Sequence, residues 1–339
     1  MAEWFNDTGM QNDIVISTRV RLARNLKGIP FPQKASEENC KKVIEMVEEA
    51  LSTLNYKFTR INIAGLFKAE RQALVEERYI SLNMAECKRP GAVFISEDKS
   101  VSIMVNEEDH IRMQSIFAGY ENQKAYDIIN KIDTYLAEKL EYAVHPKYGY
   151  LTTCMTNAGT GMRTSYMLHL PAIVNAGIAE NLFAAAGKLG ITVRGMYGEG
   201  TKAGGYMFQI SNQITMGRSE EEIMTNLSKV VENIISKERE LRTKLHKQKG
   251  MVMEDQIMRS LGILKSARLM QSKELLTLLS NIRLGISLGL ITDIDSKTLN
   301  SIMVETSPAH ITNENITTAI DRDIERATII RKKLNKQEL

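Results

Sequence analysis

Three consecutive acidic residues follow a short strand pattern and offer the chemistry of a charged site. Residues 101–105 alternate as a half-buried strand does and lead into residues 106–112 (Asn-Glu-Glu-Asp-His-Ile-Arg). Carboxylates in a turn at a strand end can orient a cationic substrate, and Arg112 adds a cation beside which an anion can bind. Taken alone, the segment is equally typical of a charged, solvated hairpin.

Two arginines project from one face of an earlier strand pattern. Over residues 14–25, period-two alternation places Ser17, Arg19 and Arg21 on the same face. Two like charges on one strand face are unfavourable unless an anion lies between them. The pattern is therefore consistent with an anion site as well as with scattered surface arginines.

A third segment contains two strand patterns around a loop of small residues. Residues 150–154 predict a strand, 155–161 a loop and 162–170 a second strand. One face of the second strand carries Arg163, Ser165 and Met167. The loop lacks the lysine of the G-x-x-x-x-G-K-[ST] motif, which excludes a P-loop here. A strand pattern that begins at Ile191 then runs into a glycine-rich turn with Arg194 and Glu199, a combination also common in plain connectors.

Together, five arginines and two glutamates lie on strands or strand-end turns of one predicted sheet. They are Arg19, Arg21, Arg112, Arg163, Arg194, Glu108 and Glu199. Such a set suits phosphoryl transfer without a P-loop, because guanidinium groups clamp triphosphate oxygens, Mg²⁺ neutralises the remaining charge and acids hold the acceptor in line. Acids are required because a guanidinium acceptor, whose pKa lies above about 12, must be oriented and lose a proton before it attacks phosphorus.

The composition excludes several other classes of function. Lys plus Arg number 44 and Asp plus Glu number 41, a balance that argues against nucleic-acid binding through bulk charge. Three separated cysteines form neither a disulfide framework nor a metal knuckle, so we expect a reducing cytoplasm and no metal site made by protein side chains alone. No secretion signal and no run of about 18 apolar residues is present, so we expect no membrane insertion.

The elements that must hold this sheet are amphipathic helices, and the chain divides into two domains. Predicted helices begin after Ser36, at Asn122, at Pro171 (through Gly187) and after Ser219. The basic segment 241–250 predicts a domain boundary, and beyond it every pattern is helical. We therefore expect an α+β chain with a first domain over residues 1–246 and an all-α domain over residues 251–339.

A charged motif lies near the end of the helical domain. Residues 322–327 (Arg-Asp-Ile-Glu-Arg-Ala) place Arg322 and Arg326 one helical turn apart, with Asp323 beside them. A cation next to an anion suits phosphoarginine, which carries a phosphate and residual guanidinium character. The alternative is a set of ion pairs within a solvated helix.

Four of these segments resemble the signatures of the phosphagen (guanidino) kinase family. Residues 17–21 are similar to its S-S-R-V-R strand, 106–112 to its N-E-E-D-H-x-R turn, 154–160 with Arg163 to its C-P-x-N-x-G-T loop, and 194–199 to its R-G-x-x-G-E turn. The resemblance implies a mostly antiparallel sheet flanked by helices, and transfer of the γ-phosphoryl group of ATP, with Mg²⁺, to a guanidino nitrogen.

The resemblance also implies roles for individual residues. It implies Glu108 as the catalytic base, Glu199 as a second acid and Cys154 as a further residue of the catalytic centre. For ATP binding it implies Ser17, Thr18, Arg19, Val20, Arg21, Arg78, Arg112, Arg163, Thr164, Ser165, Tyr166, Met167, Arg194, Gly195, Met196, Tyr197, Gly198 and Glu199. Arg78 stands where related sequences have a nucleotide-contacting histidine, so it either replaces that contact or the contact is absent.

Departures from the small-molecule kinases point to one group within the family, the bacterial protein-arginine kinases (McsB group). The arginine strand begins near residue 14, which leaves no room for the N-terminal helical domain of the small-molecule kinases. Met155 replaces the loop proline, and Met167 replaces a nucleotide-contacting histidine. The R-D-x-x-R-A motif of this group implies a phosphoarginine site at Arg322, Asp323 and Arg326.

This resemblance sets the functional expectations. It implies ATP-dependent phosphorylation of exposed arginine side chains on proteins, a mark for degradation under stress, in a cytoplasmic and allosteric homodimer. The implied partners are a zinc-binding activator protein and a Clp-type protease, and neither nucleic acid nor membrane. Two alternatives are a kinase for free arginine, which the missing N-terminal domain disfavours, and a non-catalytic phosphoarginine reader. The second is disfavoured because no clamp arginine and no acid is lost.

Overall fold

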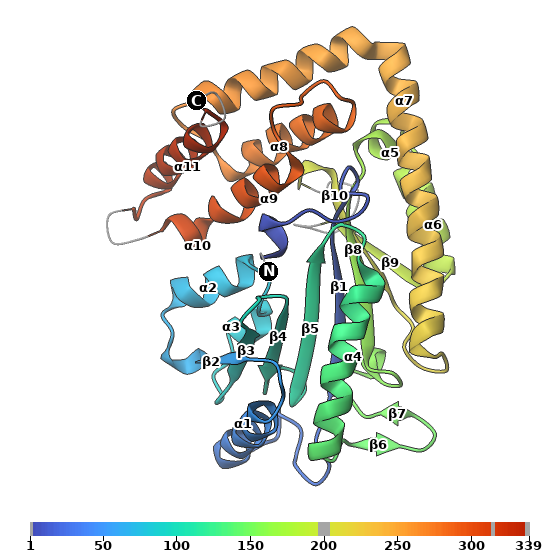
Figure 1. Cartoon of the computed structure of the whole chain (residues 1–339), viewed down its shortest axis with the longest axis vertical. Helices are drawn as coiled ribbons and strands as arrows, with labels where there is room; N and C mark the ends of the chain where they lie inside the picture. The colour runs from blue at the N-terminus through green and yellow to red at the C-terminus, as the bar shows by residue number, and fades with distance from the viewer. Residues whose placement is uncertain (1–2, 196–203, 313–315, 336–339) are drawn as a thin grey trace.

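An antiparallel sheet of eight strands forms the centre of the first domain (Figure 1). The computed structural model describes residues 3–195, 204–312 and 316–335. Strand β1 (Val15–Arg24) lies inside the sheet between β5 (Ile111–Ala118) and β8 (Met162–His169). The full order is β2 (Phe58–Asn62), β3 (Ala92–Ser96), β4 (Val101–Val105), β5, β1, β8, β10 (Met207–Asn212) and β9 (Ile191–Gly195). The prediction of an antiparallel sheet flanked by helices is confirmed.

One face of the sheet is covered by helices. Alternate residues of β1, including Val20 and Leu22, are fully buried against α1 (Glu37–Ser52) and α4 (Asn122–Lys139). The half of the sheet formed by β8, β10 and β9 packs against a second core. That core is supplied by α5 (Pro171–Asn175), α6 (Ala179–Lys188) and the first half of α7 (Glu220–Ser266). Because strand side chains alternate, Arg19 and Arg21 of β1 must project from the other face.

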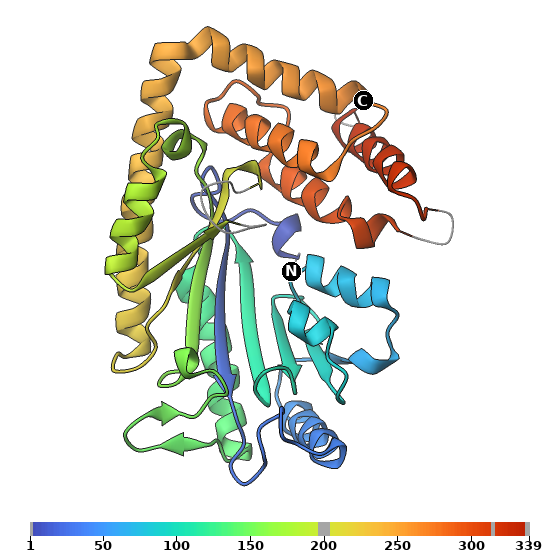
Figure 2. The ribbon, with the colours of Figure 1, turned by 180° about the vertical axis from the view of Figure 1, so that it is seen from behind.

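The other face is covered only at its margins (Figure 2). Over β3 and β4 lie the turn η2 (Ile63–Gly65), α2 (Lys68–Glu76) and α3 (Leu82–Ala85). At one end, the N-terminal turn η1 (Trp4–Asn6) and the helical domain pack on Ile116 and Met167. The polar positions of β5, β1 and β8 lie between these two coverings.

The C-terminal part of the chain contains helices joined by short loops, and no named strand is present in its described residues, in agreement with the prediction. It consists of the second half of α7, α8 (Ser272–Ser287), α9 (Ser296–Glu305), α10 (Pro308–Ile311) and α11 (Ala319–Asn335). Helix α7 bends at Lys249, where φ is −133°, and its two halves run in different directions (Figure 1). The expected domain boundary between residues 246 and 251 therefore falls at a bend within one helix and not in a loop.

Two sequence predictions of secondary structure are wrong. Of the strand expected over residues 150–154, only Tyr150 lies in a strand, β7 (Gly149–Tyr150), which pairs with β6 (Val144–His145). The chain then leaves the strand, and the Thr153 amide donates to the carboxylate of Asp109. The helix expected from Pro171 to Gly187 is split into α5 and α6 at Gly177, whose φ of +71° suits glycine but not a helix. The described residues also contain two short 3-10 turns, η3 (Met155–Asn157) and η4 (Gly204–Tyr206).

Candidate active site

The strand register gathers the predicted arginines on one face of the sheet. Arg21 lies directly opposite Arg163 on β8 and opposite Gln114 on β5. Since residues two apart share a face, Arg19 and Arg112 project from the same side. We call the surface that carries Arg19, Arg21, Arg112 and Arg163 the arginine face. A second row of opposed residues extends it to β9 and consists of Ser17, Met167, Gln209 and Arg194.

Three of these arginines are half-buried beside one another, and the hydrogen-bond acceptors that Arg19 and Arg163 meet are neutral groups. Arg19 Nη2 donates to Gln209 Oε1 at 3.4 Å, and Arg163 Nη2 donates to Ser211 Oγ at 3.3 Å. The Nε atoms of Arg21 and Arg163 are buried and meet no hydrogen-bond acceptor in the described part of the chain. Buried donors without acceptors are costly, so the face is suited to an anionic ligand that supplies them.

The charges on this face also oppose one another. Burial, followed by the neighbouring charges of Arg78 and Arg112, lowers the pKa of Arg19 to about 9. Burial and Arg19 lower the pKa of Arg21 well below its usual value, and burial and Arg194 lower that of Arg163. A polyanion would relieve both the desolvation and the mutual repulsion.

Arg112 differs because it has an acidic partner. Its Nη1 donates to both carboxylate oxygens of Glu107, at 2.8 and 2.7 Å. Burial alone would raise the pKa of Glu107, but Arg112 and the hydroxyl of Ser81 lower it below its usual value. Glu107 is therefore a fixed anion that orients Arg112.

The rest of the acidic turn is a scaffold for Glu108. Asp109 Oδ1 accepts from Asn25 Nδ2 and from the Thr153 amide, both at 2.7 Å, and His110 Nδ1 accepts from the Leu26 amide at 3.0 Å. Glu108 is half-buried, and its carboxylate accepts no hydrogen bond from any described residue. Burial and the adjacent Asp109 raise its pKa. A carboxylate in this setting is suited to accept a proton.

Cys154 lies in the loop that is tied to this turn. Thr153 Oγ1 donates to the carbonyl of Glu108 at 2.8 Å, and the Cys154 Sγ lies 2.9 Å from Thr156 Oγ1. The thiol is close enough to Arg163 to oppose a small part of the lowering of that arginine's pKa by burial and Arg194. Cys154 and Glu108 therefore belong to one loop assembly beside the arginine face.

Arg78 reaches the same face from the loop between α2 and α3. Its backbone is left-handed, with φ of +70°, and its carbonyl accepts from Gln114 Nε2 at 2.6 Å. Its guanidinium donates to Ser17 Oγ at 3.0 Å and lies 4.2 Å from the ring of Trp4. Sequence reasoning included Arg78 but missed Trp4, for which no local motif gave a signal.

Several predicted ATP-binding residues have side chains that do not reach this face. Thr18, Val20, Thr164 and Tyr166 alternate with the arginines, and each is fully buried on the helical side. Thr18 Oγ1, for example, donates to the carbonyl of Gly119 at 2.6 Å. A nucleotide on the arginine face could meet only their backbone, so the prediction is corrected for these four side chains.

The remaining predicted ATP-binding residues have different positions. Ser17 and Ser165 are buried on the arginine face, and Met167 shares this face but packs in the core under the helical domain. On β9, Arg194 is exposed and Gly195 ends the strand. Met196, Tyr197, Gly198 and Glu199 lie outside the described residues.

The motif of the helical domain is only partly accessible. Arg326 is buried, and its guanidinium donates to the carbonyl oxygens of Thr306 and Met270 and to Asp323 Oδ1, at 3.0, 2.7 and 2.5 Å. Arg322 is half-buried and donates to the carbonyl of Thr317 at 3.0 Å. Arg326 thus anchors α11 to its neighbours, which corrects the expectation that it faces a ligand.

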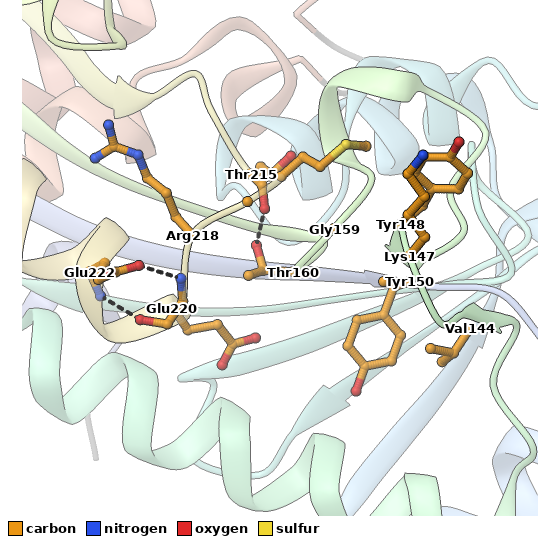
Figure 3. Close-up of a pocket in the computed structure, with 14 residues that line it drawn as sticks. Val144, Lys147, Tyr148, Tyr150, Gly159, Thr160, Thr215, Arg218, Glu220 and Glu222 are labelled. Carbon is orange, nitrogen blue, oxygen red and sulfur yellow. Dashed lines mark hydrogen bonds between the residues drawn. The ribbon is translucent and has the colours of Figure 1, made fainter.

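A groove of about 580 Å³ lies at another place, between the hairpin β6–β7 and the start of α7 (Figure 3). Tyr148 and Tyr150 line one side, and Arg218 and Glu220 line the other. None of the predicted site residues lines this groove. The candidate site is therefore the arginine face and not this hollow.

The sheet, the arginine face and the acidic turn define a guanidino phosphotransferase, and comparison with known proteins agrees. Residues 40–241 match the ATP:guanido phosphotransferase C-terminal catalytic domain, and residues 250–339 match the protein-arginine kinase McsB C-terminal domain. A taurocyamine kinase from Schistosoma mansoni with transition-state analogue components has a TM-score of 0.63 and 26% identity, over 69% of this chain and 34% of that one. A lombricine kinase has the same TM-score at 24% identity, over 69% of each chain.

Two relatives extend this likeness over the whole length. The protein-arginine kinase of Clostridium novyi is 42% identical over 100% of both chains. That of Caldanaerobacter subterraneus is 43% identical over 96% of this chain and 98% of its own. The chain belongs to the protein-arginine kinases, within the ATP:guanido phosphotransferase family, and is a phosphotransferase with a guanidino nitrogen as acceptor.

Proposed function

We propose that the enzyme transfers the γ-phosphoryl group of ATP to arginine side chains of proteins, with the triphosphate held on the arginine face. Along this face the order is Glu108, Arg112, the opposed pair Arg21 and Arg163, and then Arg19. In this assignment the acceptor guanidinium lies at the Glu108 end. The observation that carries the proposal is that the Nε donors of Arg21 and Arg163 are buried and meet no hydrogen-bond acceptor among the described residues.

Glu108 is proposed to orient the acceptor and to receive its proton. Its carboxylate has a raised pKa and accepts no hydrogen bond from the described residues, whereas Glu107 is held by Arg112. Arg21 and Arg163 are proposed to neutralise charge on the transferring group through planar, two-pronged contacts. Cys154 and, outside the described residues, Glu199 complete the proposed centre.

Mg²⁺ is proposed to accompany ATP. No group of three or more His, Cys, Asp or Glu side chains that could hold a metal ion is found in the described part of the chain. Mg²⁺ commonly keeps its waters and binds nucleotide phosphates with only one or two carboxylates, so this donor set fits it. The ion would be held by the nucleotide phosphates and its own waters, and it would supply charge neutralisation when bound.

The cellular role is a proposal drawn from the family. We propose that the phosphorylated arginines mark proteins for degradation by a Clp-type protease in the stress response, in a cytoplasmic homodimer that is controlled by a zinc-binding activator. Arg322 and Asp323 are proposed to bind phosphoarginine and to regulate activity. The chain is proposed to consist of a catalytic domain over residues 1–246 and a helical domain over residues 251–339. Among the described residues, no helix is long and apolar enough to cross a bilayer.

Incubation with ATP and an unfolded, arginine-rich protein tests the proposal. We expect acid-labile phosphate on the protein and little on free arginine added at the same concentration of guanidino groups. Preferential transfer to free arginine would favour a small-molecule kinase. Binding of phosphoarginine without any transfer would favour a non-catalytic reader.

A further inference from the structure

The N-terminal turn η1 brings the single tryptophan of the chain beside the arginine face. Trp4 is 2% exposed. It packs in a core that combines Ile16 and Ile116 of the sheet with apolar residues of the helical domain, and η1 packs on α9. The indole is therefore held in place from both domains.

Trp4 makes two contacts with neighbouring residues of the loop that carries Arg78. Its Nε1 donates to the carbonyl of Glu77 at 3.1 Å, and its ring lies 4.2 Å from the Arg78 guanidinium carbon. Gln114 holds the same loop from the sheet through the Arg78 carbonyl. The indole is thus placed to set the direction of the Arg78 side chain, which ends at Ser17.

The Arg78 side chain points toward like charge. After burial, Arg78 is the largest influence that lowers the pKa of Arg19. An arginine side chain has several rotatable bonds, so packing against a fixed ring restricts the directions that it can take. An aromatic face attracts a guanidinium, and it does so most strongly where water is excluded, as around Trp4.

We propose that Trp4 is a positioning residue that holds Arg78 at the Ser17 end of the nucleotide site. This inference rests on the proposed function, because it assumes that the arginine face binds ATP. It makes the N-terminal turn part of the nucleotide-binding apparatus, although Trp4 itself touches no reacting atom. Because η1 also packs on α9, Trp4 connects the helical domain to that site.

Steady-state kinetics in the full-length chain test this role. Trp4→Leu, which removes the aromatic face, should raise the KM for ATP about fivefold to thirtyfold and change kcat by less than about twofold. Trp4→Phe keeps a ring and should raise this KM less. Phe117→Leu is the matched control, since Phe117 is 6% exposed, packs in the core on the helical side of the sheet and has its ring 4.5 Å from Lys124 Nζ. The control should leave the KM for ATP unchanged.

Trp4 fluorescence supplies a second readout that does not depend on tolerance of the Trp4 substitutions. Titration of the wild-type chain with Mg·ADP should change the emission in a saturable manner. In Arg78→Ala the change should be absent at ADP concentrations shown by calorimetry to saturate the site. An emission change that persists in Arg78→Ala, or folded Trp4 variants with a normal KM for ATP, or an equal effect of Phe117→Leu, would overturn the inference. Failure of the proposed function is distinguishable, as a wild-type chain that neither binds ADP nor transfers phosphate.

Discussion

Two adjacent glutamates in the acidic turn have opposite environments. Glu107 is paired with Arg112, and its pKa is lowered, whereas burial and Asp109 raise the pKa of Glu108. These opposite pKa shifts give the two carboxylates different roles. A paired carboxylate stays ionised, whereas an unpaired one with a raised pKa can take up a proton. At the scale of single residues, this contrast selects Glu108 as the base.

Replacement of Glu108 by glutamine should abolish transfer and preserve ATP binding. The amide keeps the shape but cannot accept the proton, and loss of a general base costs roughly a hundredfold or more in kcat. In the wild type, activity should fall as the pH drops through the raised pKa of Glu108, because only the ionised form acts as a base. Stopped assays of phosphoprotein at several pH values measure both effects. Near-normal turnover in Glu108→Gln would remove Glu108 from this role.

Lysine should not substitute for Arg163. Lysine retains the charge but lacks the planar pair of donors, so we expect a higher KM for ATP and a kcat reduced by about tenfold or more. Arg218→Lys is the matched control, because Arg218 is exposed and lies at the groove away from the arginine face. Initial rates over a range of ATP concentrations measure the difference. Equal activity of the Arg163→Lys variant would mean that this arginine does not clamp phosphate.

At the scale of the element, β1 carries arginines toward both faces for different purposes. Arg24 faces the helices, where its Nη2 lies 2.6 Å from Asp133 Oδ2 on α4 and its guanidinium lies 3.6 Å from the centre of the Tyr150 ring. Arg21 faces the site, where its Nε is buried without a hydrogen-bond acceptor among the described residues and three neighbouring arginines outnumber Glu107. One strand therefore contains a structural cation and a functional one.

Removal of these two arginines should change stability in opposite directions. Arg21→Met relieves an uncompensated buried charge, so we expect the nucleotide-free chain to gain about 1 kcal/mol of unfolding free energy and to lose kinase activity. Arg24→Met leaves Asp133 buried without its partner, so we expect a loss of about 3–5 kcal/mol. Denaturant unfolding monitored by circular dichroism measures both changes. Destabilisation by Arg21→Met would show that its charge is already compensated.

At the scale of the whole molecule, the two domains meet through acidic residues at the end of α2. Glu76 accepts from the Ala309 amide at the start of α10 at 3.0 and 3.1 Å, and a Glu77 carboxylate oxygen lies 3.8 Å from His310 Nε2. Burial, with Glu3 and Glu76 nearby and Lys99 partly opposing them, raises the pKa of Glu77 to about 7. The folded chain therefore binds a proton on Glu77 more tightly than the unfolded chain does.

This shift predicts the pH dependence of an engineered variant. A raised pKa contributes stability that is complete below the unfolded value of about 4.5 and is lost as the pH rises through about 7. Glu77→Gln cannot ionise, so its Tm should exceed that of the wild type at pH 8 and approach it near pH 4.5. Calorimetric scans at these two values test the prediction, with Glu70→Gln on the exposed side of α2 as the control. A difference in Tm that does not depend on pH would contradict it.

Local sequence determined the elements and the kinds of chemistry that this chain contains. Period-two alternation placed Arg19 and Arg21 on one strand face, and the cap at Ser36 and the capping box at Ser219 marked where α1 and α7 begin, because these signals act within a few residues. The same alternation places Thr18 and Thr164 on the opposite, buried face.

Only the tertiary structure decided which residues meet. The pairing of Arg21 with Arg163, the tie between Thr153 and Asp109, and the packing of Trp4 on Arg78 join segments far apart in the chain. Strand order and loop hydrogen bonds are settled by long-range packing, on which the pattern of any one segment carries no information. For the same reason Arg326 looked like a ligand-binding residue in its motif and is instead an anchor whose partners lie 20 and 56 residues away.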